Sequence, residues 1–136
     1  MTAGYSGTPL IKKLGFNAGM HVWFDPAMPA AVEAEIDPTA NGIITLPHPE
    51  PGMNAAHVFV TGRRQLTDAI ATIRPLLSPS GFLWVSWPKK ASKVPADITE
   101  DVIREYALPT GFVDVKVCAV DATWSGLKLM IRRELR

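Results

Sequence analysis

This sequence has a single cysteine, no excess of charge of one sign and no long apolar run. Cys118 is the only cysteine, which excludes an internal disulfide and a zinc cluster built from cysteines. The formal net charge is +1, too balanced for a dedicated nucleic-acid binder, so any positive patch must be local. No stretch approaches the roughly 20 apolar residues that span a bilayer, and the N-terminus lacks the apolar centre of a signal peptide. We therefore expect a cytoplasmic protein without a membrane or specific nucleic-acid partner.

Familiar catalytic motifs are also missing. The three histidines, His21, His48 and His57, do not have the spacing of a metal motif, so no metal site is predicted. There is no phosphate-binding glycine loop and no serine in a nucleophile elbow. Asp25 and Asp121 could pair as carboxylates, but both also suit ordinary turns. The sequence assigns no catalytic residue.

What is present predicts a packed globule, with 47% hydrophobic and 20% charged residues in a chain of 136. We expect one domain over residues 1–136. Helices are predicted over residues 9–14 (with Thr8 as the cap), 29–36, 65–77 and 99–107, from caps, prolines and apolar periodicity. Strands are predicted over residues 21–24, 43–46, 56–61, 82–87, 113–119 and 127–131.

Strands that alternate with helices indicate a three-layer α/β fold around a mainly parallel, Rossmann-like sheet of about six strands. The last two strands are joined by a turn too short for a crossover, so the final strand should be antiparallel to its neighbours. Val113, Val115 and Val117 alternate with polar residues, which predicts that they share one face of the fifth strand.

The segment from residue 56 to the end has a recognisable order: strand (AHVFVT), helix, strand (LLSPSGFLWVSWPK), helix, strand and reversed strand. It resembles the C-terminal half of class I methyltransferases, and the LSPSG of residues 77–81 is similar to their L-x-P-G-G turn. This resemblance implies a methyltransferase-like scaffold, with S-adenosylmethionine as cofactor.

The N-terminal half departs from that family. Its first strand is followed by DPAMP (residues 25–29), where the family carries a glycine-rich turn against the cofactor. Leu46 is followed by Pro47 and His48, where an acidic residue usually binds the ribose. We therefore expect no cofactor in the main interpretation, and S-adenosylmethionine only in the alternative. Whether the chain is an enzyme stays open, and the missing glycine turn weighs against it.

Five further segments carry a second resemblance, over nearly the whole chain: residues 5–10 (YSGTPL), 13–15 (KLG), 84–90 (WVSWPKK), 99–105 (TEDVIRE) and 124–128 (WSGLK). They are similar to a family of small bacterial proteins known as domain of unknown function 3052. That family implies no activity.

In parallel α/β sheets, ligands bind outside the carboxyl ends of the strands. Four cations follow predicted strands: Arg63 and Arg64 after the third, Lys89 and Lys90 after the fourth. Arginines are unfavourable in the first turn of a helix, where the free N–H groups instead attract anions. We hypothesise that these cations face a shared anionic ligand or an acidic partner surface; a solvated basic rim is the alternative.

Four more residues are expected at the same edge and complete the candidate ligand-binding set: Asp25, His48, Trp87 and Trp124. Trp87 and Trp124 could stack on a ligand or fill a partner's pocket, or simply pack between hairpin and loop. Trp84 is expected in the core, on the opposite face of the sheet from Trp87.

Three functions fit these features. The favoured one is a non-catalytic binding or regulatory module on a reduced methyltransferase-like scaffold, binding an anionic small molecule or acidic protein surface. The alternative is a divergent S-adenosylmethionine-dependent methyltransferase. The third is an oligomeric structural protein that pairs through the strand edge of its C-terminal hairpin.

Overall fold

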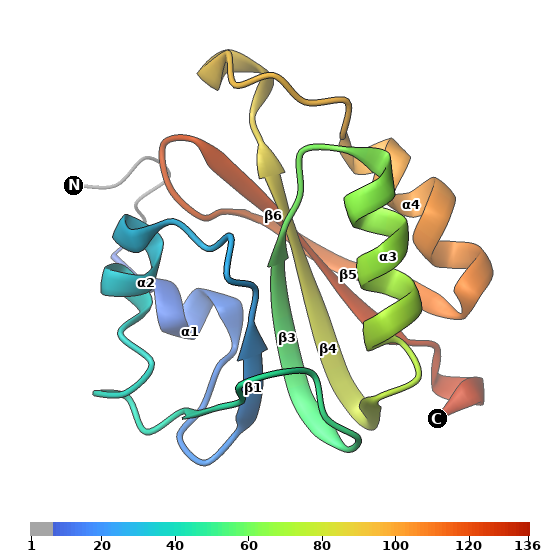
Figure 1. Cartoon of the computed structure of the whole chain (residues 1–136). Coiled ribbons are helices and arrows are strands. Elements are labelled where there is room, and N and C mark those ends of the chain that lie inside the picture. Colours follow the sequence, from blue (N-terminus) through green and yellow to red (C-terminus); the bar gives the residue numbers. More distant parts are fainter. Residues whose placement is uncertain (1–6) are drawn as a thin grey trace.

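The computed structural model describes residues 7–136 and contains a six-stranded sheet with the order β2-β1-β3-β4-β6-β5 (Figure 1). The strands are β1 (His21–Phe24), β2 (Ile44–Thr45), β3 (Met53–Phe59), β4 (Leu77–Pro88), β5 (Phe112–Ala119) and β6 (Trp124–Ile131). The first four strands in sequence are parallel, whereas β6 runs antiparallel to both β4 and β5. This confirms the predicted Rossmann-like α/β fold with a reversed last strand. Two residues of the YSGTPL segment, Tyr5 and Ser6, lie outside the described residues.

Helices cover both faces of the sheet (Figure 1). They are α1 (Leu10–Leu14), α2 (Ala30–Ile36), α3 (Arg63–Ile73) and α4 (Glu100–Ala107). Helices α1 and α2 pack on the face that presents Val22 and Phe82, and α3 and α4 on the face that presents Val58 and Leu83. Because β3 and β4 lie between two helical layers, they are apolar on both faces, as expected of central parallel strands.

Helix boundaries differ slightly from the prediction. Helix α1 begins after Pro9 rather than after Thr8, and it ends at Gly15, which has the left-handed φ of 76°. Helix α3 ends four residues earlier than predicted, because Leu77 pairs with Met53 as the first residue of β4. None of the described helices has the length and apolar character required to span a bilayer.

The regular alternation predicted for the fifth strand is interrupted. Between Asp114 and Lys116 the register against β6 shifts by one residue, which is a β-bulge. Val113 and Val117 therefore lie on opposite faces of the sheet rather than sharing one, and Val113, Val115 and Val117 are all exposed. The bulge suits the position of β5 at the edge of the sheet. A bulge makes an edge strand a poorer template for pairing with another chain.

The connection from β2 to β3 leaves one face of β1 without a helix. It consists of residues 46–52 only, although parallel strands usually need a crossover of a dozen or more residues. So short a connection is sufficient because β2 is two residues long and ends beside Val22, near the start of β1. Trp23, on the α3 side of β1, is therefore only half-buried, and a hollow remains between β1 and α3.

Gly126, in β6, is a position where an added methyl group would crowd the buried core of the sheet. A Cβ there would lie 3.0 Å from the ring of Trp84 and 3.3 Å from Ser86 Oγ. We expect Gly126→Ala to lower the free energy of unfolding by about 1–2 kcal/mol, because the buried indole must shift. Urea unfolding measures the loss. Gly62→Ala is the control, since its Cβ would meet only Asp97 Oδ1 at 3.9 Å, and an equal loss in both variants would contradict the steric explanation.

Candidate functional site

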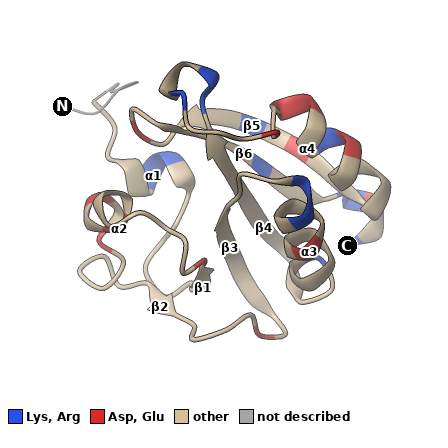
Figure 2. Cartoon of the chain, turned by 45° about the horizontal axis from the view of Figure 1, so that its top comes forward, with Lys and Arg blue, Asp and Glu red and all other residues tan. Residues whose placement is uncertain are grey.

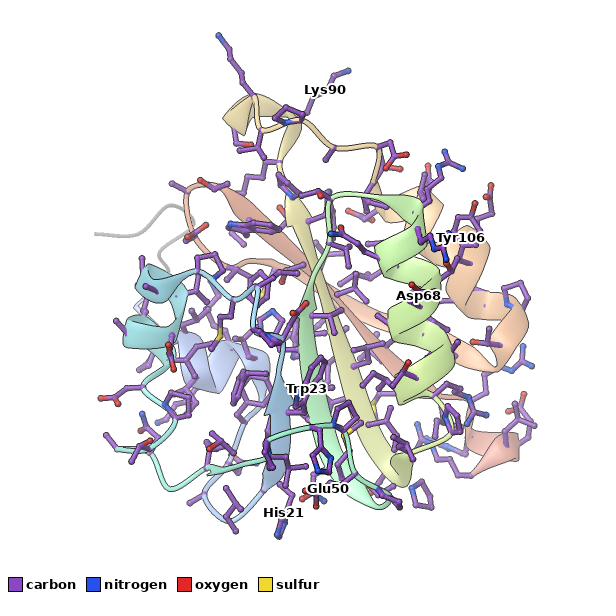
Figure 3. The ribbon with its side chains drawn as sticks, viewed as in Figure 1. His21, Trp23, Glu50, Asp68, Lys90 and Tyr106 are labelled. Carbon is purple, nitrogen blue, oxygen red and sulfur yellow. The ribbon has the colours of Figure 1, made fainter. Side chains whose placement is uncertain are left out.

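A pocket of about 300 Å³ opens where β1 and β3 end side by side. The chain leaves β1 for α2 on one face of the sheet and leaves β3 for α3 on the other, so this is a topological switch point. Open α/β sheets place their ligands in the crevice at such a point. We call it the switch-point pocket; its lining includes Trp23, Asp25, Val58, Gln65, Asp68 and Ala69. Figure 3 shows Trp23 on β1 facing the open space beside α3, which carries Asp68.

Asp25 lies at the carboxyl end of β1, as predicted, and its carboxylate fixes the backbone at the edge of the pocket through two hydrogen bonds. Its Oδ1 accepts a hydrogen bond from the Ala27 N–H at 2.9 Å, and its Oδ2 accepts one from the Phe59 N–H at 3.0 Å. One carboxylate therefore fixes the turn after β1 and ties that turn to β3. Each oxygen has further lone pairs with which to accept a bond from a ligand.

Gln65 forms the other rim and was not singled out from the sequence. Its Oε1 accepts hydrogen bonds from the backbone N–H groups of Thr61 at 2.7 Å and Gly62 at 3.1 Å. This capping arrangement explains why α3 begins at Arg63, two residues before the predicted start. The signal was available, because a helix N-cap followed three residues later by glutamine is a start pattern.

A second hollow of about 440 Å³ lies between the start of α3, the end of β4 and the loop that follows β4. We call it the basic hollow; its lining includes Arg63, Trp87, Lys90, Lys93, Val94 and Asp97. Positive charge gathers on the loop after β4 and at the start of α3, whereas carboxylates lie along α4 (Figure 2).

The structure does not bring the four predicted cations together. Arg63 and Lys90 line the basic hollow. Arg64 is 91% exposed on its side chain and pairs with Asp68 at 3.9 Å, in the next turn of α3. Lys89 points to the hairpin instead, where its Nζ donates a hydrogen bond to the Asp121 carbonyl at 2.9 Å. The expectation of one shared site for all four is therefore corrected: consecutive residues project in different directions and find different partners.

The two edge tryptophans belong to different sides of the sheet. Trp87 is almost buried and forms part of the basic hollow, on the α3 side. Trp124 is half-buried on the α1 side and packs edge-on against Phe59, with 5.2 Å between ring centroids. Trp84 is fully buried on that side as well, so the predicted opposition of Trp84 and Trp87 is confirmed.

His48 does not lie at the carboxyl edge. Leu46 and Glu50, two residues before and two residues after it, line a hollow with His21, the first residue of β1. Figure 3 shows Glu50 beside His21 at that end of the strand. His48 lies there because β2 is short. Its last residue, Thr45, pairs with Val22 near the start of β1, so the residues that follow β2 are still near the amino ends of the strands.

Other chemistry has little support in the described part of the chain. Burial raises the pKa of the half-buried Cys118 thiol, which lowers its reactivity. Asp121 acts as a turn residue, its Oδ1 accepting hydrogen bonds from the N–H groups of Thr123 and Trp124. Within residues 7–136 no group of three or more histidine, cysteine or acidic residues is placed to hold a metal ion.

Solved structures identify the scaffold. An S-adenosylmethionine-dependent methyltransferase from Aquifex aeolicus is 14% identical over 90% of this chain and 87% of its own, with a TM-score of 0.63. Fibrillarin from Aeropyrum pernix, with natively bound S-adenosyl-L-methionine, is 10% identical over 93% of this chain and 70% of its own, with a TM-score of 0.55. The fold is methyltransferase-like. LepI in complex with the same molecule also matches, with 12% identity and a TM-score of 0.61, although this chain spans only 47% of it.

Sequence comparison adds nothing to this. No family model and no curated protein matches the chain, so the resemblance to domain of unknown function 3052 is not confirmed.

The structural matches correct the functional interpretation made from the sequence. The non-catalytic binding or regulatory module was favoured because the turn after β1 has no glycine. The chain nevertheless shares its fold with S-adenosylmethionine-dependent methyltransferases, and these matches favour the enzyme alternative. The missing glycine was an insufficient criterion, because a pocket forms at the switch point although the turn after β1 has none; Asp25 of that turn, Trp23 and α3 line it. The expectation of no cofactor does not account for neighbours that hold one.

Proposed function

We propose that this chain is a divergent S-adenosylmethionine-dependent methyltransferase that binds its cofactor in the switch-point pocket. The observation that carries the proposal is the position of this pocket, at the junction of β1 and β3 in a methyltransferase-like fold. Its volume of about 300 Å³ stands at the lower end of the usual range for ligand pockets.

The lining suits the parts of the cofactor. S-adenosylmethionine carries a positive sulfonium and a positive amino group, and the carboxylates at the pocket are those of Asp25 and Asp68. The adenine requires a flat apolar surface, which the indole of Trp23 offers beside Val58 and Ala69. When bound, the cofactor supplies an activated methyl group.

The turn after β1 contributes less than in relatives with a glycine-rich turn. Two of its amides are already engaged: the Ala27 N–H donates to Asp25 Oδ1, and the Met28 N–H donates to the Asp25 carbonyl. Pro26 and Pro29 have no N–H to offer. The cofactor is therefore expected to lie toward Trp23 and α3 rather than against this turn.

Calorimetric titration of the protein with S-adenosylmethionine, and with its demethylated product, tests the proposal. We expect micromolar binding of both and at least 10-fold weaker binding by the Ala69→Phe variant, because a phenyl ring on α3 fills the pocket. Ala71→Phe is the matched control: Ala71 is exposed on the same helix and does not line the pocket, so this variant should bind as the wild type does.

Two results would overturn the proposal. One is the absence of cofactor binding by the folded wild-type protein, with folding verified by circular dichroism. The other is equal binding by Ala69→Phe and Ala71→Phe, which would place any binding site outside this pocket.

A further inference from the structure

The basic hollow has a charge and a lining that the cofactor does not require. We propose that it binds a small organic anion, that is, a molecule joining a carboxylate or phosphate group to an apolar or aromatic body. Its role as the second substrate rests on the proposed function and on the closeness of the two cavities, since Arg63 lines the hollow and Gln65, two residues further along α3, lines the switch-point pocket.

The charge of the hollow is positive. Three cations line it, Arg63, Lys90 and Lys93, against the single carboxylate of Asp97. Arg63 is shared between Asp97 and Glu105, with distances of 3.8 Å to each. Lys90 and Lys93 form no ion pair with any residue in the described part of the chain. Lys90 extends into solvent at the top of the molecule, where it can approach an anion from outside (Figure 3).

The walls of the hollow are apolar. Trp87 contributes one of them, and Val94, Pro95 and Ile98 belong to the same lining. The volume of about 440 Å³ exceeds what a bare phosphate or sulfate ion fills and lies within the range typical of ligand pockets. An apolar group on the ligand would displace water from these apolar walls and so gain binding free energy, whereas a bare inorganic ion has no apolar surface to bury. The lining therefore favours an organic body attached to the anionic group.

The backbone at Lys93 supports a functional role for this loop. Lys93 has a φ of 62°, in the left-handed region that glycine adopts at no steric cost and that lysine adopts unfavourably. Its N–H donates to the Lys90 carbonyl, and Ser92 Oγ donates to the Lys89 carbonyl at 2.6 Å, so the loop is held in this conformation. Strained side-chain-bearing residues of this kind concentrate at ligand sites.

The loop is also fastened beside the switch-point pocket. The Asp97 N–H donates a hydrogen bond to the Thr61 carbonyl at 3.1 Å, which joins the far end of the loop to the turn before α3. A ligand in the basic hollow thus lies next to the carboxyl end of β3.

The test is calorimetric titration at low salt with benzoate, phenyl phosphate and, as the neutral analogue, benzyl alcohol. We expect at least one anion to bind, benzyl alcohol not to bind, and the affinity to fall with added salt. Lys90→Gln and Lys93→Gly should each weaken binding of the anion by at least 5-fold. Lys93→Gly should also leave the thermal midpoint unchanged or raise it, since it relieves the backbone. Lys116→Gln, on the exposed edge strand β5, is the matched control and should change nothing.

The outcomes separate this inference from the proposed function. Failure of both anions to bind, or equal binding by Lys90→Gln, Lys93→Gly and wild type, overturns the anion site. S-adenosylmethionine binding alongside such a failure leaves the enzyme proposal intact. Anion binding without any cofactor binding supports the site but overturns its role as the place of the second substrate.

Discussion

The free energy of unfolding should fall steeply when the pH is lowered from 6.5 toward 3, because His57 is buried as a neutral ring. It is fully buried in β3, and desolvation lowers its pKa from 6.5 to about 3. Between pH 3 and pH 6.5 the unfolded chain binds a proton at His57 that the folded chain does not, so the free energy of unfolding rises with pH. Above pH 6.5 the ring is neutral in both states, and His57 causes no further change. At about 1.4 kcal/mol per pH unit, we expect His57 to lower the free energy of unfolding by roughly 3 kcal/mol at pH 4.5 relative to pH 7.5. Urea unfolding at the two pH values measures it.

The surroundings of His57 explain why the charged ring is excluded. One nitrogen, Nε2, is 2.7 Å from Ser86 Oγ, whereas Nδ1 has no hydrogen-bond partner among the described residues. The charged ring would carry an N–H at both nitrogens, and the one at Nδ1 would be buried without an acceptor and away from water.

The His57→Gln variant isolates this effect from that of the carboxylates, which also titrate in acid. Glutamine can still bond Ser86 but takes no proton, so the stability of the wild type relative to the variant should fall by roughly 3 kcal/mol from pH 7.5 to pH 4.5. His48→Gln is the matched control, because it makes the same change at an exposed histidine and keeps the buried ring of His57. A wild type and a His57→Gln variant with the same pH dependence would contradict the assignment.

The sequence predicted most of this fold because its local signals and its tertiary structure agree. The periodic residues Leu66, Ile70 and Ile73 do form the buried face of α3. The short turn before β6 does make that strand antiparallel to β4 and β5. The prediction was wrong in β5, where a bulge changes the phase of alternation, because residue spacing carries no information about an extra unpaired residue.

The candidate site was harder to predict than the fold. Asp25, Arg63 and Lys90 were placed correctly at the carboxyl edge, because that edge follows from strand direction alone. The division into two hollows was not foreseen, since it depends on where each side chain points. Trp23 was missed for a different reason: it looks like an ordinary strand residue. Its partial exposure follows from the absence of a helix between β2 and β3, which the length of that connection already indicated.

Replacing Trp84 by phenylalanine should cost more stability than replacing Trp87, although both lie in β4. Trp84 is fully buried, and its Nε1 donates a hydrogen bond to the Leu14 carbonyl at 2.7 Å, at the C-terminal end of α1. Trp84→Phe leaves that carbonyl without its donor and opens a cavity, which together should lower the free energy of unfolding by about 3 kcal/mol. Urea unfolding followed by circular dichroism measures the loss, since the change removes a fluorophore.

The difference between the two tryptophans arises from what the indole nitrogen does. Trp87 is 8% exposed and forms no hydrogen bond through its side chain to the described residues, so Trp87→Phe should cost only about 1 kcal/mol. The Leu14 bond also predicts where the damage falls: in Trp84→Phe, amide exchange should accelerate in α1 far more than in α4, which lies on the opposite face. Equal losses in the two variants, or equal exchange in the two helices, would mean that the indole bond does not anchor α1 to the sheet.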